Sequence, residues 1–247
     1  MKTVEFGKQN NDVIMLLHGG GLSWWNYKAE AELLKNRYHV VLPILDGHAG
    51  SDNDFISIEK NASRLISFID KEFGGSVLLI GGLSLGAQIL VEMLTQQNTI
   101  CQNAVIESAS VIPSKLTNLL IKPMFSLSYG LVKMKCFSQM QFDYLQIRKD
   151  LFEDYYRDTS QISKENMIAF LEANTSYVIK PSLQDTHAKV HVLVGEKEQK
   201  KMICSAERLH KALPGSVLEI KKGLYHGEYS INHPEEYTKE LLDMIDV

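Results

Sequence analysis

Ser84 stands at the centre of a Gly-Leu-Ser-Leu-Gly segment at positions 82–86. The residues just before it, 77–80, form an apolar strand-like run, and apolar residues recur after it at the spacing of one helix face. In so tight a turn, side chains at the two glycine positions would collide with the neighbouring strand and helix. The serine hydroxyl would then be exposed at a helix N-terminus, where free N–H groups favour negative charge. This pattern predicts a nucleophilic serine.

A serine hydroxyl needs a base to remove its proton, and histidine is the usual base near neutral pH. His226 is the best placed of the eight histidines, because it lies in a loop between a strand-like segment and the final helix. His18 is expected to brace the glycine loop that follows it, and His233 to belong to the first turn of the last helix. We expect His48 to lie on the same rim as Ser84 and to line the substrate pocket.

A carboxylate must orient that imidazole and stabilise its charged form. Glu198 follows the strand-like segment 190–194 and precedes His226, which gives the order serine, acid, histidine along the chain. Glu196 is the reserve for this role. Glu107, at the end of the preceding strand-like segment, is a weaker rival that could also reach the histidine. We therefore expect Glu198 to be the acid.

Main-chain N–H groups must stabilise the alkoxide that forms when a serine attacks a carbonyl group. Leu85, the residue after the serine, offers one N–H from the start of its helix. The glycine run 19–21 offers a second, most plausibly from Gly20, because glycines let the backbone approach a substrate closely. Trp24 follows this loop and is expected to contribute an apolar wall to the substrate pocket.

The segments around these residues alternate between strand-like and helical patterns. Alternation of this kind favours an α/β fold with a mostly parallel central sheet flanked by helices, with functional groups at the carboxyl ends of the strands. The expected strands are 13–17, 39–45, 77–80, 103–107, 190–194 and 216–220. The expected helices are 27–35, 58–69, the segment from 87 onward, 205–213 and 235–245.

Residues 111–188 break this alternation. They contain one glycine of the sixteen in the chain, and they read as helical in 116–121 and 166–173. A stretch this long is too long for a plain loop in a compact domain. We expect residues 111–188 to be a helical cap inserted into a core domain made of residues 1–110 and 189–247.

Together these residues resemble the α/β-hydrolase superfamily over essentially the whole chain. The segment 46–51, Asp-Gly-His-Ala-Gly-Ser, is similar to its D-x-P-G-H-G-x-S loop without the proline. The resemblance implies an acyl-enzyme mechanism on Ser84 with His226 as base and Gly20 and Leu85 as the oxyanion site. Two departures stand out: Glu198 replaces the usual aspartate, and the chain before the strand at 13–17 has room for about one strand.

The composition excludes several classes of function. A net charge of −4 without a basic stripe argues against a nucleic-acid partner. No apolar run is long enough to span a membrane, so we expect no membrane partner. Three widely separated cysteines indicate a reducing, cytoplasmic setting, and no clustered ligand set predicts a metal or other cofactor.

The expected activity is hydrolysis of a small or medium carboxylic ester, since the aromatic insertion suits an apolar acyl substrate better than a sugar or phosphate. Two alternatives stay open. One is a thioester or carbon–carbon bond hydrolase of the same fold. The other is a ligand-binding signalling protein that retains the serine, histidine and acid.

Overall fold

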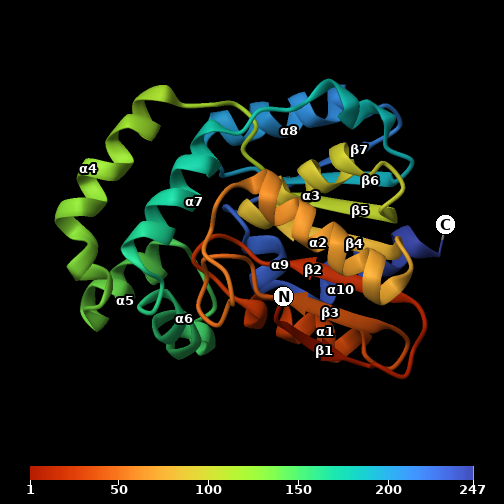
Figure 1. The fold of residues 1–247 in the computed structure, drawn as a ribbon, viewed down its shortest axis with the longest axis horizontal. Helices are drawn as coiled ribbons and strands as arrows, with labels where there is room; N and C mark the ends of the chain where they lie inside the picture. The colour runs from red at the N-terminus through yellow and green to blue at the C-terminus, as the bar shows by residue number, and fades with distance from the viewer. Residues whose placement is uncertain (247) are drawn as a thin grey trace.

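The central sheet has seven strands in the order β1-β3-β2-β4-β5-β6-β7, of which only β1 runs antiparallel to its neighbour. The computed structural model describes residues 1–246, and Figure 1 shows the sheet with helices on both faces. The strands are β1 (Thr3–Phe6), β2 (Val13–Leu17), β3 (His39–Pro43), β4 (Val77–Leu83), β5 (Cys101–Glu107), β6 (Lys189–Gly195) and β7 (Val217–Lys221). The expected mostly parallel α/β fold is confirmed.

Two layers of helices cover the sheet. Helices α2 (Ile58–Phe73), α3 (Leu85–Gln96) and α8 (Lys200–Ala212) lie on one face, and α1 (Lys28–Leu34) and α10 (Pro234–Ile245) lie on the other. The short α9 (Glu228–Asn232) lies on the α10 side. All five residues of β2 are buried, with Met15 facing the first layer and Ile14 the second. A strand buried on both faces is continuously apolar, which is why the run 13–17 does not alternate.

Residues 111–188 contain helices and connecting turns but no strand, and all of these residues lie in the part of the chain that the structure describes. The helices are α4 (Lys115–Val132), α5 (Lys135–Tyr144), α6 (Phe152–Thr159) and α7 (Lys164–Ser176), and Figure 1 shows them gathered on one side of the sheet. The first helix is longer than the apolar spacing at 116–121 predicts, and α5 and α6 were not predicted individually. Three short 3₁₀ segments complete the fold: η1 (Trp24–Tyr27), η2 (Lys149–Leu151) and η3 (Pro181–Asp185).

Two hydrogen bonds tie α6 to the segment that follows β2. The indole N–H of Trp25 donates to Oδ2 of Asp158 in α6 at 2.8 Å. The hydroxyl of Thr159 donates to the carbonyl oxygen of Gly21 at 2.9 Å. The insertion is thus anchored on the glycine loop that follows β2, although the boundaries of a separate cap domain stay a prediction.

None of the helices in residues 1–246 combines the length and the apolar character needed to cross a lipid bilayer.

Candidate functional site

Ser84 lies between the end of β4 and the start of α3 with a φ angle of +53°. A positive φ is unfavourable for a residue with a side chain and occurs where the surrounding structure enforces it. The N–H of Ser84 donates to the carbonyl oxygen of Glu107 on the neighbouring strand at 2.9 Å, which holds the turn in place. A Cβ at Gly82 would lie 2.6 Å from the carbonyl oxygen of Gly86, so the flanking glycines are sterically required.

His226 approaches this serine from the loop between β7 and α9. Its Nε2 atom lies 3.0 Å from Oγ of Ser84, within hydrogen-bonding distance, although 142 residues separate the two in sequence. Gly227, directly after the histidine, has a φ of +69° and packs against Leu83 at the end of β4. The side chain of His226 is 42% exposed, so solvent or a substrate can reach the pair.

Glu198 completes a chain of three side chains. Its Oε2 atom lies 2.6 Å from Nδ1 of His226, and the carboxylate is fully buried. Its other oxygen, Oε1, accepts from the N–H of Gly195 at 2.8 Å and from the hydroxyl of Ser108 at 2.6 Å. Burial alone would raise the pKa of Glu198, but the bonds from His226, Ser108 and Gly195 hold it below its ordinary value. The carboxylate is therefore kept ionised beside the imidazole.

The two rival carboxylates, those of Glu196 and Glu107, are hydrogen-bonded to other groups. Glu196 is exposed and accepts from the N–H of Gly223 at 2.8 Å. Glu107 is buried, and its Oε1 atom accepts from the N–H of Ser230 at 3.3 Å, whereas Oε2 has no hydrogen-bond partner among the described residues. Burial raises the pKa of Glu107 to about 7. Neither carboxylate is hydrogen-bonded to His226 in residues 1–246.

The two residues expected to supply main-chain N–H groups, Gly20 and Leu85, lie close together. Leu85 is the first residue of α3, and Gly20 lies against it: a Cβ at Gly20 would be 3.5 Å from the Cβ of Leu85. Within residues 1–246, neither N–H group donates to another protein atom. Both groups are thus without a protein acceptor among the described residues, and their role as an oxyanion site stays a prediction.

His18 and His48 hold the glycine loop 19–21 in place through hydrogen bonds. His18 donates from Nδ1 to the carbonyl oxygen of Gly19 at 2.8 Å and accepts from the N–H of Leu45 at 3.2 Å. His48 accepts from the N–H of Gly21 at 3.0 Å through Nε2. Burial lowers the pKa of His48 to about 4 and that of His18 well below its ordinary value, so both rings are neutral at physiological pH. The bracing role expected of His18 matches these contacts, whereas substrate contact by His48 stays a prediction.

Trp24 lies in the 3₁₀ turn η1, directly after the glycine loop. It is partly buried and packs against the apolar cluster on the α1 and α10 side of the sheet. Its contact with a substrate likewise stays a prediction.

Ser108 is a site residue that the sequence reasoning did not single out. It follows the end of β5 with a φ of +55°, and its N–H donates to the carbonyl oxygen of Leu193 at 2.9 Å. This strained position turns the hydroxyl toward Glu198. The available signal was the segment 107–110, Glu-Ser-Ala-Ser, at a strand end on the same rim as Ser84.

A cavity of about 520 Å³ opens beside His226 and Glu198. Residues from α5 and the turn after it form one wall, and Met202 and Tyr225 lie on the core side. Tyr144 and Leu145 also line a neighbouring apolar cavity of about 450 Å³. The approach to the histidine is therefore bordered by large apolar side chains.

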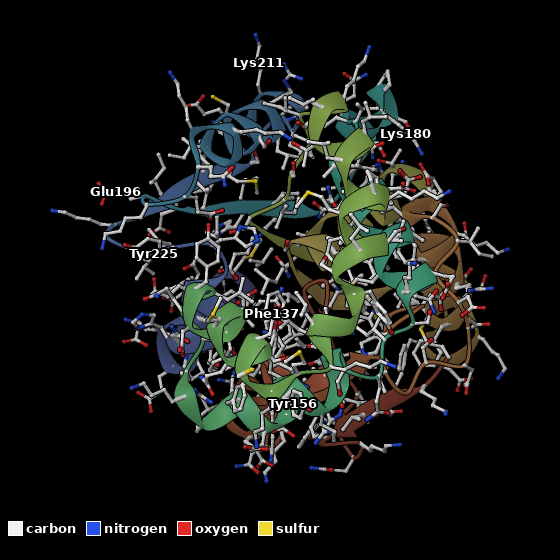
Figure 2. The ribbon with its side chains drawn as sticks, turned by 90° about the vertical axis from the view of Figure 1, so that its left-hand side faces the viewer. Phe137, Tyr156, Lys180, Glu196, Lys211 and Tyr225 are labelled. Carbon is white, nitrogen blue, oxygen red and sulfur yellow. The ribbon has the colours of Figure 1, made fainter. Side chains whose placement is uncertain are left out.

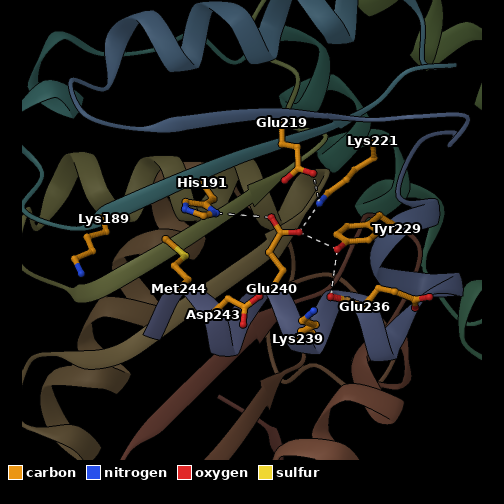
Figure 3. Close-up of a pocket in the computed structure, with 10 residues that line it drawn as sticks. All are labelled: Lys189, His191, Glu219, Lys221, Tyr229, Glu236, Lys239, Glu240, Asp243 and Met244. Atoms are coloured by element: carbon orange, nitrogen blue, oxygen red, sulfur yellow. Dashed lines mark hydrogen bonds and ion pairs between the residues drawn. The ribbon is translucent and has the colours of Figure 1, made fainter. Parts of the chain in front are cut away.

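A second cavity of about 520 Å³ lies beside β6, β7 and α10, and Figure 3 shows its lining. At its centre Glu240 accepts from the hydroxyl of Tyr229 at 2.8 Å and pairs with Lys221 and His191. Although burial opposes it, the contacts with His191, Lys221 and Tyr229 lower the pKa of Glu240 to about 2. Oε2 of Glu240 is held by Lys221 and Tyr229, whereas Oε1 lies 3.7 Å from Nδ1 of His191 and has no hydrogen-bond partner among the described residues. We interpret the cluster as a structural ion network between α10 and the sheet.

Within residues 1–246, no group of three or more histidine, cysteine, aspartate or glutamate side chains could hold a metal ion. The three cysteines are unpaired, and Cys101 is buried.

Comparison with known proteins identifies relatives over nearly the whole chain. The model of the alpha/beta hydrolase family matches residues 14–239. Among solved structures, a thermophilic esterase from Thermogutta terrifontis is 15% identical with a TM-score of 0.81, covering 99% of this chain and 92% of that one. The enol-lactonase from Burkholderia xenovorans LB400 is 14% identical with a TM-score of 0.83, covering 100% and 96%. An esterase from Exiguobacterium antarcticum is 15% identical with a TM-score of 0.82, covering 99% and 95%. A search of curated proteins finds no match.

Proposed function

The chain belongs to the alpha/beta hydrolase family, and we propose that within this family it is a serine hydrolase that cleaves a small or medium carboxylic ester. The observation that carries the proposal is the continuous hydrogen-bonded series from Ser84 through His226 to Glu198, with separations of 3.0 Å and 2.6 Å. Such a series is what a serine nucleophile requires, because each member activates or orients the previous one.

The proposed mechanism proceeds through an acyl-enzyme. Oγ of Ser84 attacks the ester carbonyl carbon while Nε2 of His226 takes the hydroxyl proton, and Glu198 stabilises the imidazolium. The carbonyl oxygen becomes an alkoxide that accepts hydrogen bonds from the N–H groups of Gly20 and Leu85. His226 then gives its proton to the leaving alcohol as the carbon–oxygen bond breaks.

The second half repeats these steps with water. His226 takes a proton from a water molecule, whose oxygen attacks the acyl carbon. As the tetrahedral intermediate collapses, the bond to Oγ breaks, and the proton returns from His226 to Ser84. The carboxylic acid leaves, and the enzyme is regenerated without any cofactor.

An ester is the preferred substrate class for two reasons. The cavity beside His226 is lined by Tyr144, Leu145 and Met202, which offer apolar surface to an acyl or alcohol group, together with the polar side chains of Gln146, Lys197 and Gln199. Two proteins of similar fold, from Thermogutta terrifontis and Exiguobacterium antarcticum, are esterases, although identities of 15% transfer the fold and not the substrate.

The proposal is tested with p-nitrophenyl acetate and p-nitrophenyl butyrate. We expect turnover by the natural chain and a loss of at least about 10³-fold in Ser84→Ala. The matched control is Ser110→Ala, another serine at the carboxyl edge of the sheet, which should retain activity. Full activity in Ser84→Ala would refute the proposal.

A fluorophosphonate probe distinguishes an ester hydrolase from a signalling protein that retains the three side chains. Covalent labelling of Ser84 with rapid ester turnover supports the hydrolase. Labelling with negligible turnover on a broad panel of esters and acyl-CoA thioesters would overturn it.

A further inference from the structure

The exposed face of α4 is apolar along its entire length. Leu127 is 91% exposed and Leu119 is 73% exposed, values unusual for leucine in a folded protein. The same face carries four more large apolar side chains, Leu116, Leu120, Met124 and Leu131. On a helix these positions form a single stripe, because they recur at intervals of three and four residues. Packing within this chain leaves the stripe uncovered.

The opposite face of α4 packs against the rest of the protein. Asn118 donates to the carbonyl oxygen of Glu172 on α7 at 2.8 Å, and the hydroxyl of Tyr129 donates to the carbonyl oxygen of Ile162 at 2.6 Å. Ile121 is buried on this side. The orientation of α4 is therefore fixed by α7, and the apolar stripe points away from the protein. Figure 1 shows α4 at the outer edge of the helical insertion.

The net charge of the segment that contains α4 and α5 is opposite in sign to that of the whole chain. Residues 115–144 contain four lysines and one aspartate, whereas the chain carries a net charge of −4. At about 100° per residue, Lys115, Lys122 and Lys133 fall within roughly 20° of one another around the helix axis. All three are exposed, and on an ideal helix they form a row along one border of the apolar stripe. Lys133 directly follows α4, and its Nζ lies over the ring of Tyr129, 5.5 Å from the ring centre. The fourth, Lys135, is paired with Glu153 at 2.7 Å.

We propose that the apolar, lysine-bordered face of α4 docks on an anionic lipid surface. A helix that lies in a membrane interface needs an apolar face that enters the acyl region and basic residues that reach acidic headgroups, and α4 has both. The docking is peripheral and involves no crossing of the bilayer. It goes beyond the sequence expectation of no membrane partner, which rested on the absence of a spanning segment.

A second copy of this chain fits the face less well. A symmetric dimer would place the stripe against itself, and the patch offers three lysines and no acidic side chain to pair with them. A folded protein partner usually anchors large side chains in pockets, and neither cavity beside the core is lined by α4. A fluid lipid layer needs no such pocket.

The position of the patch relates it to the candidate site. Apolar exposure continues from α4 onto α5 through Met140 and Tyr144, which are 67% and 81% exposed. Tyr144 also lines the cavity beside His226. Figure 2 shows α4 and α5 on the face turned toward the viewer, with Tyr225 near α5. A docked protein would therefore present the approach to His226 close to the lipid.

Co-sedimentation with phosphatidylcholine vesicles, with and without phosphatidylglycerol, tests this inference. We expect the chain to sediment with the vesicles that contain phosphatidylglycerol and to be released by high salt, since screening weakens headgroup contacts. Leu127→Glu should abolish sedimentation. The matched control is Ile56→Glu, at a loop position that is 65% exposed and distant from α4 in sequence, which should bind like the natural chain.

Charge is tested separately from apolar burial. Lys115→Gln combined with Lys122→Gln should weaken binding about fivefold for each lysine removed. The control pair is Lys60→Gln with Lys211→Gln, which are exposed lysines on α2 and α8. Leu127→Glu, Ile56→Glu and the two lysine double variants should all hydrolyse a water-soluble ester equally, because none of these side chains belongs to the candidate site.

The outcomes are independent of the proposed activity, since Ser84→Ala should bind vesicles as the natural chain does. The inference would be overturned if the chain sedimented with neither kind of vesicle. It would also be overturned if Leu127→Glu sedimented as much as the natural chain. A dimer in solution that Leu127→Glu converts to a monomer without any vesicle binding would overturn it as well, because a second copy would then be the occupant.

Discussion

The hydroxyl of Ser108 donates to Oε1 of Glu198 at 2.6 Å, while Oε2 of the same carboxylate lies 2.6 Å from Nδ1 of His226. One oxygen of the carboxylate is thus held by Ser108 and by the N–H of Gly195, and the other is left for the imidazole. A glutamate has one more rotatable bond than an aspartate, so its orientation costs more conformational entropy. We infer that Ser108 is a positioning residue that fixes the longer acid.

Ser108→Ala tests this relationship. Loss of a hydrogen bond to a charged group costs about 1.5–3 kcal/mol, so we expect kcat to fall about tenfold or more with little change in KM. The pKa of Glu198 should rise, because a bond that favours its ionised form is gone. Glu198 would then become protonated at a higher pH, so the loss of kcat/KM relative to the natural chain should be larger at acidic pH than at neutral pH.

A purely structural role for Ser108 would lower thermal stability without moving the pH profile. Ser110→Ala removes a hydroxyl two positions away that makes no hydrogen bond to Glu198, and it serves as the matched control. If Ser108→Ala has the same pH profile as Ser110→Ala and the natural chain, the positioning role is wrong.

Three glutamines distinguish the candidate acids. Glu198→Gln should lower kcat by about 10³–10⁴-fold, because an amide cannot stabilise the imidazolium. Glu196→Gln should leave turnover within about twofold, since this side chain is exposed and contacts Gly223. Glu107→Gln should have a smaller effect than Glu198→Gln, because Glu107 bonds to Ser230 and not to the histidine. An equal loss in Glu107→Gln and Glu198→Gln would contradict the assignment.

Gly86→Ala should disrupt the turn that carries Ser84. A Cβ there would fall on the carbonyl oxygen of Leu17 and 2.6 Å from that of His18, and neither backbone atom can move without distorting β2. We expect a loss of about 3 kcal/mol in the free energy of unfolding, together with loss of esterase activity. Thermal denaturation measures the first effect.

Gly130 in α4 is the matched control. A Cβ at this position would meet no atom within 4 Å, and the residue is helical. Gly130→Ala should therefore stabilise the chain by about 0.5–1 kcal/mol. A destabilisation of Gly130→Ala equal to that of Gly86→Ala would show that the steric account of the turn is wrong.

Because of Glu30, we expect the stability of the folded protein to fall as the pH rises. Glu30 is buried, neither carboxyl oxygen has a hydrogen-bond partner among the described residues, and burial raises its pKa from 4.5 to about 8. In the unfolded chain it ionises above pH 4.5, whereas in the folded chain it stays protonated up to about pH 8. The unfolded state therefore binds fewer protons between these limits, and stability declines across that interval.

Glu30→Met removes this buried carboxyl group and keeps a side chain of similar length. The variant should gain melting temperature relative to the natural chain at pH 8, and the gain should be smaller at pH 5. Differential scanning calorimetry at the two pH values measures this. A gain that is independent of pH would exclude ionisation of Glu30 as the cause.

Much of the fold was predictable from local patterns. The apolar run at 13–17 corresponds to β2, and the helix-face spacing from Ile58 onward corresponds to α2. These predictions succeed because strand and helix periods depend on neighbours within a few residues. The extent of α4 was not predictable, because Pro123 lies inside it and a proline normally ends or kinks a helix.

The sequence alone determined that Ser84 stands in a tight turn, since a Cβ at Gly82 would collide with the carbonyl oxygen of Gly86 only four residues away. The need for a glycine at position 86 depends on the tertiary structure, because a Cβ there would collide with the carbonyl oxygens of Leu17 and His18. The partners of that serine were a matter for the tertiary structure. Glu196, Glu198 and Glu107 all follow strand ends and are equivalent in chemistry. Only the parallel order of β4, β5, β6 and β7 determines which carboxylate reaches the imidazole and which serine holds it. Distances between residues far apart in the chain depend on the packing of whole strands, which no local pattern encodes.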